Sequence, residues 1–201
     1  MKIFLKSFSY IFHPLLMPML GVAIYFTITP KFVPEPFLYA KLLALTILTV
    51  VVPILFYFLL RNLNVVSSIF LSEVSERRIP LLCNIALTLI ILKIIINGYE
   101  FPELYFFFIA ILLSSALCFL FAVFRFKVSL HLVGVTGVLF FVCGLSVYYS
   151  SNLLLLIALL TFAAGGAASS RLQDKAHTNL ELITGFLVGA VPQVVIFLFW
   201  L

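Results

Sequence analysis

Long apolar runs alternate with short polar segments along the whole chain. Seven runs can be marked, and each has about 17 to 23 residues, the length that crosses roughly 30 Å of hydrocarbon at about 1.5 Å per helical residue. They cover residues 13–29, 38–60, 80–96, 103–124, 130–149, 153–168 and 180–201. This pattern predicts an all-α fold, a polytopic membrane helix bundle of about six to seven transmembrane helices, with residues 1–201 as a single domain.

Composition supports a membrane environment. The chain is 65% hydrophobic and 9% charged, whereas a soluble domain is about half apolar and about one quarter charged. The net charge is +5, but most cations stand at the ends of apolar runs, which argues against a nucleic-acid partner. We therefore expect an integral multi-pass protein of a bacterial inner (cell) membrane, with membrane lipids around it.

Three polar joints follow the second, fourth and sixth runs, at residues 61–78, 125–129 and 169–179. If every run crosses the membrane, all three joints open on the same face, which is also the face of the N-terminus. Residues far apart in sequence can therefore meet at one site there.

These joints and the helix starts after them carry most of the side chains suited to chemistry. Arginine holds phosphate through paired hydrogen bonds, histidine can act as nucleophile or acid near neutral pH, and free N–H groups at a helix start favour an anion. Together they predict a phosphate-binding site at the membrane edge. The candidate residues are Arg77, Arg78, Lys127, Ser129, His131, Ser170, Arg171, His177 and Glu181.

The strongest pair is His177 and Glu181, which stand four residues apart. That spacing lets the carboxylate hold the imidazole in one orientation. Structural alternatives exist for each part. Cations beside membrane helices can be topology determinants, and Ser129 can cap the fifth helix. Arg171, His177 and Glu181 can together be a polar cap on the last helix. His13 is interpreted as a polar interface residue.

The third joint also resembles a known signature. Ser170-Arg171, five residues, His177, three residues and Glu181, followed by spaced glycines, is similar to the third signature of the type-2 phosphatidic acid phosphatase superfamily. That signature has Asp where this chain has Glu181. The glycines are Gly185 and Gly189.

The other two joints resemble the remaining signatures of this family more loosely. Ser129-Leu130-His131 is similar to Pro-Ser-Gly-His, although leucine replaces the glycine and Val128 replaces the proline. Arg77 or Arg78, followed by Ile79 and Pro80, resembles the Arg-Pro end of the first signature, and Leu71 stands where the family has lysine. Lys127 can supply the missing charge.

The resemblance implies metal-independent hydrolysis of a phosphomonoester or pyrophosphate of a lipid, without a cofactor. His177 would form a phosphohistidine, Glu181 would orient it, and His131 would protonate the leaving oxygen. The substrate-binding residues would be Arg77, Arg78, Lys127, Ser129, Ser170 and Arg171. Two alternatives stay open: a catalytically inactive lipid-phosphate-binding or assembly protein of the same fold, and a small transporter.

Charge asymmetry predicts an orientation. The face with the three joints carries nine cations: Lys2, Lys6, Arg61, Arg77, Arg78, Arg125, Lys127, Arg171 and Lys175. The other face carries two, Lys31 and Lys41. The positive-inside rule then places the joints and the N-terminus in the cytoplasm.

Overall fold

A computed structural model describes residues 2–68, 71 and 73–200, with side chains from residue 7 onward. Every regular element in this described part is helical, and six helices are long and apolar enough to cross a membrane. These six spans are Glu35–Asn62, Ser75–Ile95, Pro102–Val123, Leu130–Tyr148, Leu154–Gln173 and Asn179–Phe197. The prediction of a polytopic helical membrane bundle is confirmed.

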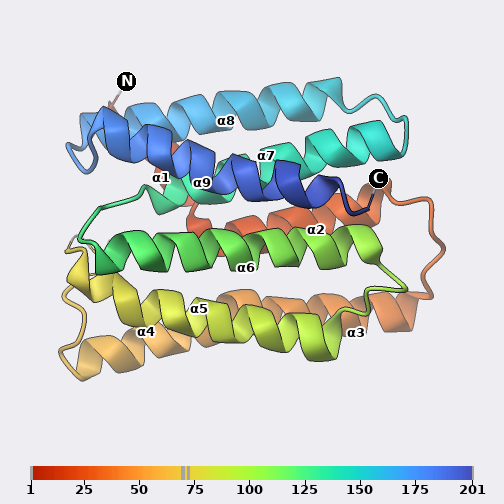
Figure 1. Ribbon diagram of the computed structural model, residues 1–201, viewed down its shortest axis with the longest axis horizontal. Coiled ribbons are helices and arrows are strands. Elements are labelled where there is room, and N and C mark those ends of the chain that lie inside the picture. The colour runs from red at the N-terminus through yellow and green to blue at the C-terminus, as the bar shows by residue number, and fades with distance from the viewer. Residues whose placement is uncertain (1, 69–70, 72, 201) are drawn as a thin grey trace.

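The first apolar run is shorter than a full span. It forms a 3₁₀ turn, Pro14–Leu16, and helix α2, Met17–Ile28, which together reach about 22 Å at about 1.5 Å per residue. Helix α1, Lys2–Ile11, precedes it and packs against α8. The seven apolar runs of the sequence thus form six spans and one shorter apolar helix, α2. Helix α2 still runs alongside the six spans (Figure 1).

Two spans contain π-helical turns. The first joins α3, Glu35–Thr46, to α4, Val52–Asn62, through Ile47–Val51. Pro53 follows that turn and has no N–H to donate, so the regular hydrogen-bond pattern cannot continue through it. The second is the span Ser75–Ile95. A 3₁₀ turn leads into its helix α5, Arg78–Ile90, and a π-helical turn ends the span at Ile95.

Helix α7, Leu130–Tyr148, is the packing centre of the bundle. It contacts α9 (Asn179–Phe197), α8 (Leu154–Gln173), α6 (Pro102–Val123) and α2. Glycines permit the close approach of α9. A Cβ at Gly185 would lie 2.7 Å from the Ser129 carbonyl oxygen, and one at Gly189 would collide with Thr136 and the Val133 carbonyl. Small residues at such crossings are the usual way for membrane helices to pack closely.

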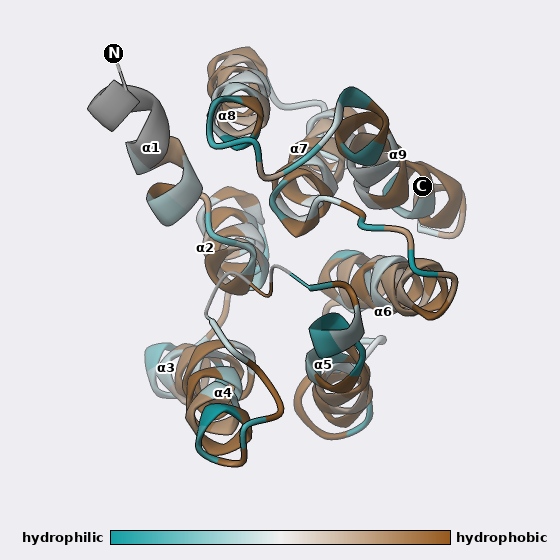
Figure 2. Cartoon of the chain, turned by 90° about the vertical axis from the view of Figure 1, so that its left-hand side faces the viewer, coloured by the Kyte–Doolittle hydropathy of each residue, from teal (hydrophilic) through white to brown (hydrophobic). Residues whose placement is uncertain are grey.

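The three polar joints lie at one end of the bundle, as the sequence predicts. They and α1 are at the left of Figure 1, while the loops after α2, α5 and α7 are at the right. Figure 2 looks onto the joint-bearing end, where hydrophilic segments connect helices that are largely hydrophobic. Segments from all parts of the chain therefore meet at this end.

The opposite end is held by a buried carboxylate. Glu103 is fully buried and accepts hydrogen bonds from Tyr25 (2.9 Å) and Tyr149 (3.0 Å). Lys31 adds an ion pair at 3.1 Å. Because every oxygen of Glu103 has a partner, this network joins α2, α6 and α7 rather than offering a free acid.

Substitution of Gly189 by alanine should destabilise the bundle. The added methyl group collides with Thr136 and with backbone of α7, and overpacking of this kind costs about 1–3 kcal/mol. Gly165→Ala is the matched control because nothing lies within 4 Å of its would-be Cβ. Thermal unfolding in detergent should show a lower midpoint for Gly189→Ala alone. Equal midpoints for the two variants would contradict the close α7–α9 contact.

Candidate functional site

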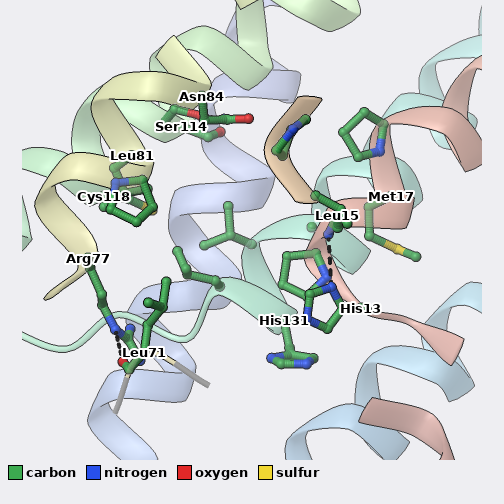
Figure 3. A pocket seen from close by; sticks show the side chains of 18 of the residues that line it. His13, Leu15, Met17, Leu71, Arg77, Leu81, Asn84, Ser114, Cys118 and His131 are labelled. Carbon is green, nitrogen blue, oxygen red and sulfur yellow. Dashed lines mark hydrogen bonds between the residues drawn. The ribbon is translucent and has the colours of Figure 1, made fainter. Parts of the chain in front are cut away.

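A cavity of about 900 Å³ opens among the helices and includes residues of all three joints. Its walls come from α2, α4, α5, α6, α7 and α9, with the α8–α9 joint at one end. Figure 3 shows Arg77 on one side and His13 with His131 on the other. Five of the lining residues are ones that the sequence analysis selected in three separate segments: Arg77, Lys127, His131, Arg171 and His177.

Positive charge dominates the joint-bearing end of this cavity. Of the five charged residues that line it, four are cations: Arg77, Lys127, Arg171 and Lys175, against the single acid Asp174. Burying unpaired cations is costly. This excess of positive charge is suited to an anion.

Arg77 is the most deeply placed cation, with 5% of its surface exposed. It lies in the 3₁₀ turn that begins the second span, and its Nε and Nη1 donate to the carbonyls of Leu71 (2.9 Å) and Val128 (2.7 Å). These acceptors fix the guanidinium but are uncharged. No carboxylate in the described part of the chain forms an ion pair with Arg77, so its charge is available to a ligand.

Arg171 is placed at the end of α8 and is 6% exposed. Its Nη2 pairs with Asp174 at 2.8 Å. Its Nε is buried and has no hydrogen-bond partner among the described residues. An unpaired buried donor of this kind is rare in folded proteins, and an anion in the cavity would supply the acceptor.

His177 precedes α9 and is held by Glu181. The carboxylate Oε2 accepts from His177 Nδ1 and from the Thr178 N–H, both at 3.0 Å, and Thr178 in turn caps the Glu181 N–H. Glu181 thus both caps the helix and orients the imidazole. Because a carboxylate only accepts, Nδ1 carries the proton and Nε2 carries a lone pair in the neutral ring.

The environment keeps that imidazole neutral. Burial, and then the Arg77 charge, lower the pKa of His177 below its ordinary value, while the Glu181 hydrogen bond acts in the opposite direction. Burial and Arg77 also lower the pKa of Lys127. Lys127 Nζ donates to the Ala176 carbonyl at 3.0 Å, so this cation lies beside the His177 joint. A neutral, oriented imidazole among cations is suited to nucleophilic attack on an anionic substrate.

His131 lies on the first turn of α7 and lines the same cavity. Its Nε2 is 3.1 Å from the Ser9 carbonyl oxygen. The His13 ring stands nearly perpendicular to it, with 5.5 Å between ring centroids. His131 is therefore contacted by the N-terminal segment rather than by another joint.

Four predicted site residues do not line the cavity, and one of them is Glu181, which contacts His177. Arg78 donates to the carbonyls of Ala122 (3.3 Å) and Val123 (3.4 Å), which terminate α6. Ser129 is fully buried beneath Gly185, with its hydroxyl unpaired. Ser170 is buried and shares a hydrogen bond of 2.8 Å with the Ser9 hydroxyl. The structure brings the other predicted site residues together without these four.

Beyond its polar end the cavity is deep and mostly apolar, with Asn84 and Ser114 among its few polar lining residues. Gln193 lines it fourteen residues after the start of α9, which corresponds to about 21 Å of helix. Leu87 and Phe107 line the same region. The cavity thus continues from the joints into the hydrocarbon depth of the bundle.

Some lining residues were not selected from the sequence. His13 was interpreted as an interface residue, yet it lies in the cavity beside His131. Asp174 and Lys175 lie in the third joint but are not among the predicted site residues. His13 precedes Pro14 on the same membrane face as the joints, and that shared face is the one sequence signal that could have identified it.

Among the described residues, no group of three or more His, Cys, Asp or Glu side chains is arranged to hold a metal ion. Comparisons with protein family models, curated proteins and solved structures find no match to this chain.

Proposed function

We propose that this chain is a membrane lipid phosphatase that hydrolyses a phosphomonoester or pyrophosphate of a lipid through a phosphohistidine intermediate. The observation that carries the proposal is one cavity with two chemical ends. Its outer end has two buried guanidinium groups with incomplete pairing and an oriented neutral histidine, and its inner end is mostly apolar. A phosphate headgroup on a hydrocarbon tail matches both ends.

The chemistry follows from the residues at the outer end. His177 Nε2 attacks phosphorus while Nδ1–H keeps its hydrogen bond to Glu181. The carboxylate therefore stabilises the positive charge that develops on the imidazole ring. Arg77, Lys127 and Arg171 hold the phosphoryl oxygens, because phosphoryl transfer depends on positioning and positive charge. His131 gives its proton to the leaving oxygen and then takes one from the water that hydrolyses the phosphohistidine.

The apolar depth of the cavity refines the expectation for the substrate. From the sequence, the lipid tail would stay in the surrounding bilayer while the headgroup enters the site. A cavity of about 900 Å³ that extends beside Leu87 and Phe107 supports a tail that enters the bundle. We therefore propose a lipid phosphate with at least one tail held between the helices.

Adjacent arginines offer a matched test of this site. In detergent, the purified protein should release inorganic phosphate from at least one member of a panel of lipid phosphates and pyrophosphates. Arg77→Met should lower kcat/KM about a hundredfold or more, the usual effect of removing one charged transition-state donor. Arg78→Met, which changes the neighbouring arginine outside the cavity, should stay within a few-fold of wild type.

The histidines give the second part of the same assay. His177→Ala should reduce phosphate release to background, and His131→Ala should cost about a hundredfold. Full activity in His177→Ala would refute the mechanism. Lipid-phosphate binding without release by wild type would instead support the alternative of an inactive binding protein.

We also infer the membrane and orientation. The chain is an integral multi-pass membrane protein, and we place it in a bacterial inner membrane with the three joints in the cytoplasm. The cation asymmetry of nine against two supports this. The side chains of Lys2 and Lys6, and Leu201, lie outside the described residues.

Cysteine labelling tests that orientation. Ser75 is exposed at the joint-bearing end and Tyr99 is 99% exposed at the opposite end. With Cys83, Cys118 and Cys143 changed to alanine, a membrane-impermeant reagent should label Tyr99→Cys on intact cells and leave Ser75→Cys unlabelled. Selective labelling at position 75 would reverse the assignment.

A further inference from the structure

Deep in the cavity, one buried polar side chain has no partner. Gln193, on the second half of α9, is 5% exposed and lines the cavity. Its side-chain amide forms no hydrogen bond to any residue in the described part of the chain. A primary amide has two N–H donors and a carbonyl acceptor, and buried polar groups are almost always paired. A ligand that fills the cavity beside Gln193 therefore has to offer it a hydrogen-bonding group.

The polar groups of the neighbouring helices already have structural partners. Pro192 has no N–H, so the Val188 carbonyl lacks its usual helical donor, and the Ser114 hydroxyl donates to it at 2.9 Å. The adjacent Ser115 hydroxyl accepts from the Asn84 amide at 2.8 Å. These contacts connect α6 to α9 and to α5, whereas the unpaired glutamine amide takes no part in them.

The depth of Gln193 can be measured along α7. Its Nε2 lies 4.0 Å from the position of a Cβ on Gly137, and Gly137 lies six residues after His131, or about 9 Å along the helix. Asn84, which also lines the cavity, lies seven residues after Arg77, or about 10 Å along its span. Figure 3 shows Asn84 at the end of the cavity away from Arg77 and His131. The glutamine amide thus lies about 10 Å deeper than the cationic end.

An acyl carbonyl of a glycerolipid phosphate fits this spacing. About six covalent bonds, or roughly 7 Å of extended chain, separate phosphorus from the nearest acyl carbonyl oxygen. A hydrogen bond to an N–H group adds about 2.9 Å, so phosphorus and the glutamine nitrogen would stand about 10 Å apart. A carbonyl oxygen only accepts hydrogen bonds, which suits the N–H groups of the amide. Isoprenoid chains and ether-linked alkyl chains have no carbonyl at this depth.

We propose, resting on the lipid phosphate proposed above, that Gln193 is a specificity residue that donates a hydrogen bond to an acyl carbonyl of the bound lipid. The cations hold the phosphate, and Gln193 binds the carbonyl about 10 Å deeper. A site that hydrogen-bonds one group of its ligand discriminates against an analogue without that group, because its own polar group then stays unpaired. The cavity therefore selects acylated lipid phosphates over isoprenoid and ether-linked ones.

Matched phosphonates test carbonyl recognition without relying on turnover. The probes are the phosphonate analogues of dioleoylglycerol phosphate, whose tails are ester-linked, and of its dioleyl ether. In both, a methylene group replaces the oxygen between phosphorus and glycerol, so that neither headgroup can be hydrolysed. Purified full-length wild type should bind the ester probe about fivefold or more tightly than the ether probe, which is the range expected for one hydrogen bond.

Methionine at position 193 removes the amide and keeps a side chain of similar length. Gln193→Met should weaken binding of the ester probe about fivefold and leave binding of the ether probe within about twofold, so that the preference disappears. Val194→Met is the matched control, because Val194 is the next residue of α9, is 49% exposed and does not line the cavity. It should keep the wild-type preference.

Two results would overturn the inference: equal affinity of wild type for the two probes, or an ester preference that persists in Gln193→Met. The wild-type comparison decides the first point even where a variant fails to fold. Selective binding of the ester probe without phosphate release from any lipid phosphate would refute the phosphatase proposal alone. Phosphate release from a lipid phosphate, with equal affinity for the two probes, would refute the carbonyl contact alone.

Discussion

Buried positive charge without sufficient negative charge is the constraint on which the site depends. Arg77 and Arg171 are each more than nine-tenths buried, yet the acids that pair at this end are Asp174, with Arg171, and Glu181, with His177. Two carbonyls hold the Arg77 guanidinium in place, and an anion would offset the remaining cost of burying these charges. The lowered pKa of His177 has the same origin, because burial and Arg77 disfavour its charged form. The proposed anion binding and the proposed neutral nucleophile would thus have one electrostatic origin.

The packing of α9 against α7 brings this charge to the right place. Gly185 and Gly189 let the helices approach so closely that the Ser129 N–H donates to the Glu181 carbonyl at 3.2 Å. That contact joins the second joint to the third and sets His131 and His177 along one cavity. The buried Glu103 network fixes α2, α6 and α7 at the far end. The cavity lies between these two fixed ends.

Much of this could be predicted from the sequence, because run lengths and the alternation of sides depend only on hydropathy and helix rise. The i, i+4 spacing likewise predicted the His177–Glu181 contact, which the structure shows at 3.0 Å. The choice between Arg77 and Arg78 could not be predicted. Adjacent helical residues differ in direction by about 100°, and only the 3₁₀ turn at Ser75–Arg77 decides which one enters the cavity. The position of His13 beside His131 likewise depends on the packing of the 3₁₀ turn Pro14–Leu16 against α7, which no local pattern encodes.

The most direct test of the account is to look for the covalent intermediate. Purified protein is mixed with a lipid phosphate, quenched at high pH within milliseconds and analysed by peptide mass spectrometry. The account predicts a phosphoryl group on the peptide that contains His177, alkali-stable, acid-labile and missing in His177→Ala. Phosphorylation of a different residue, or turnover with no phosphohistidine at any quench time, would contradict the account.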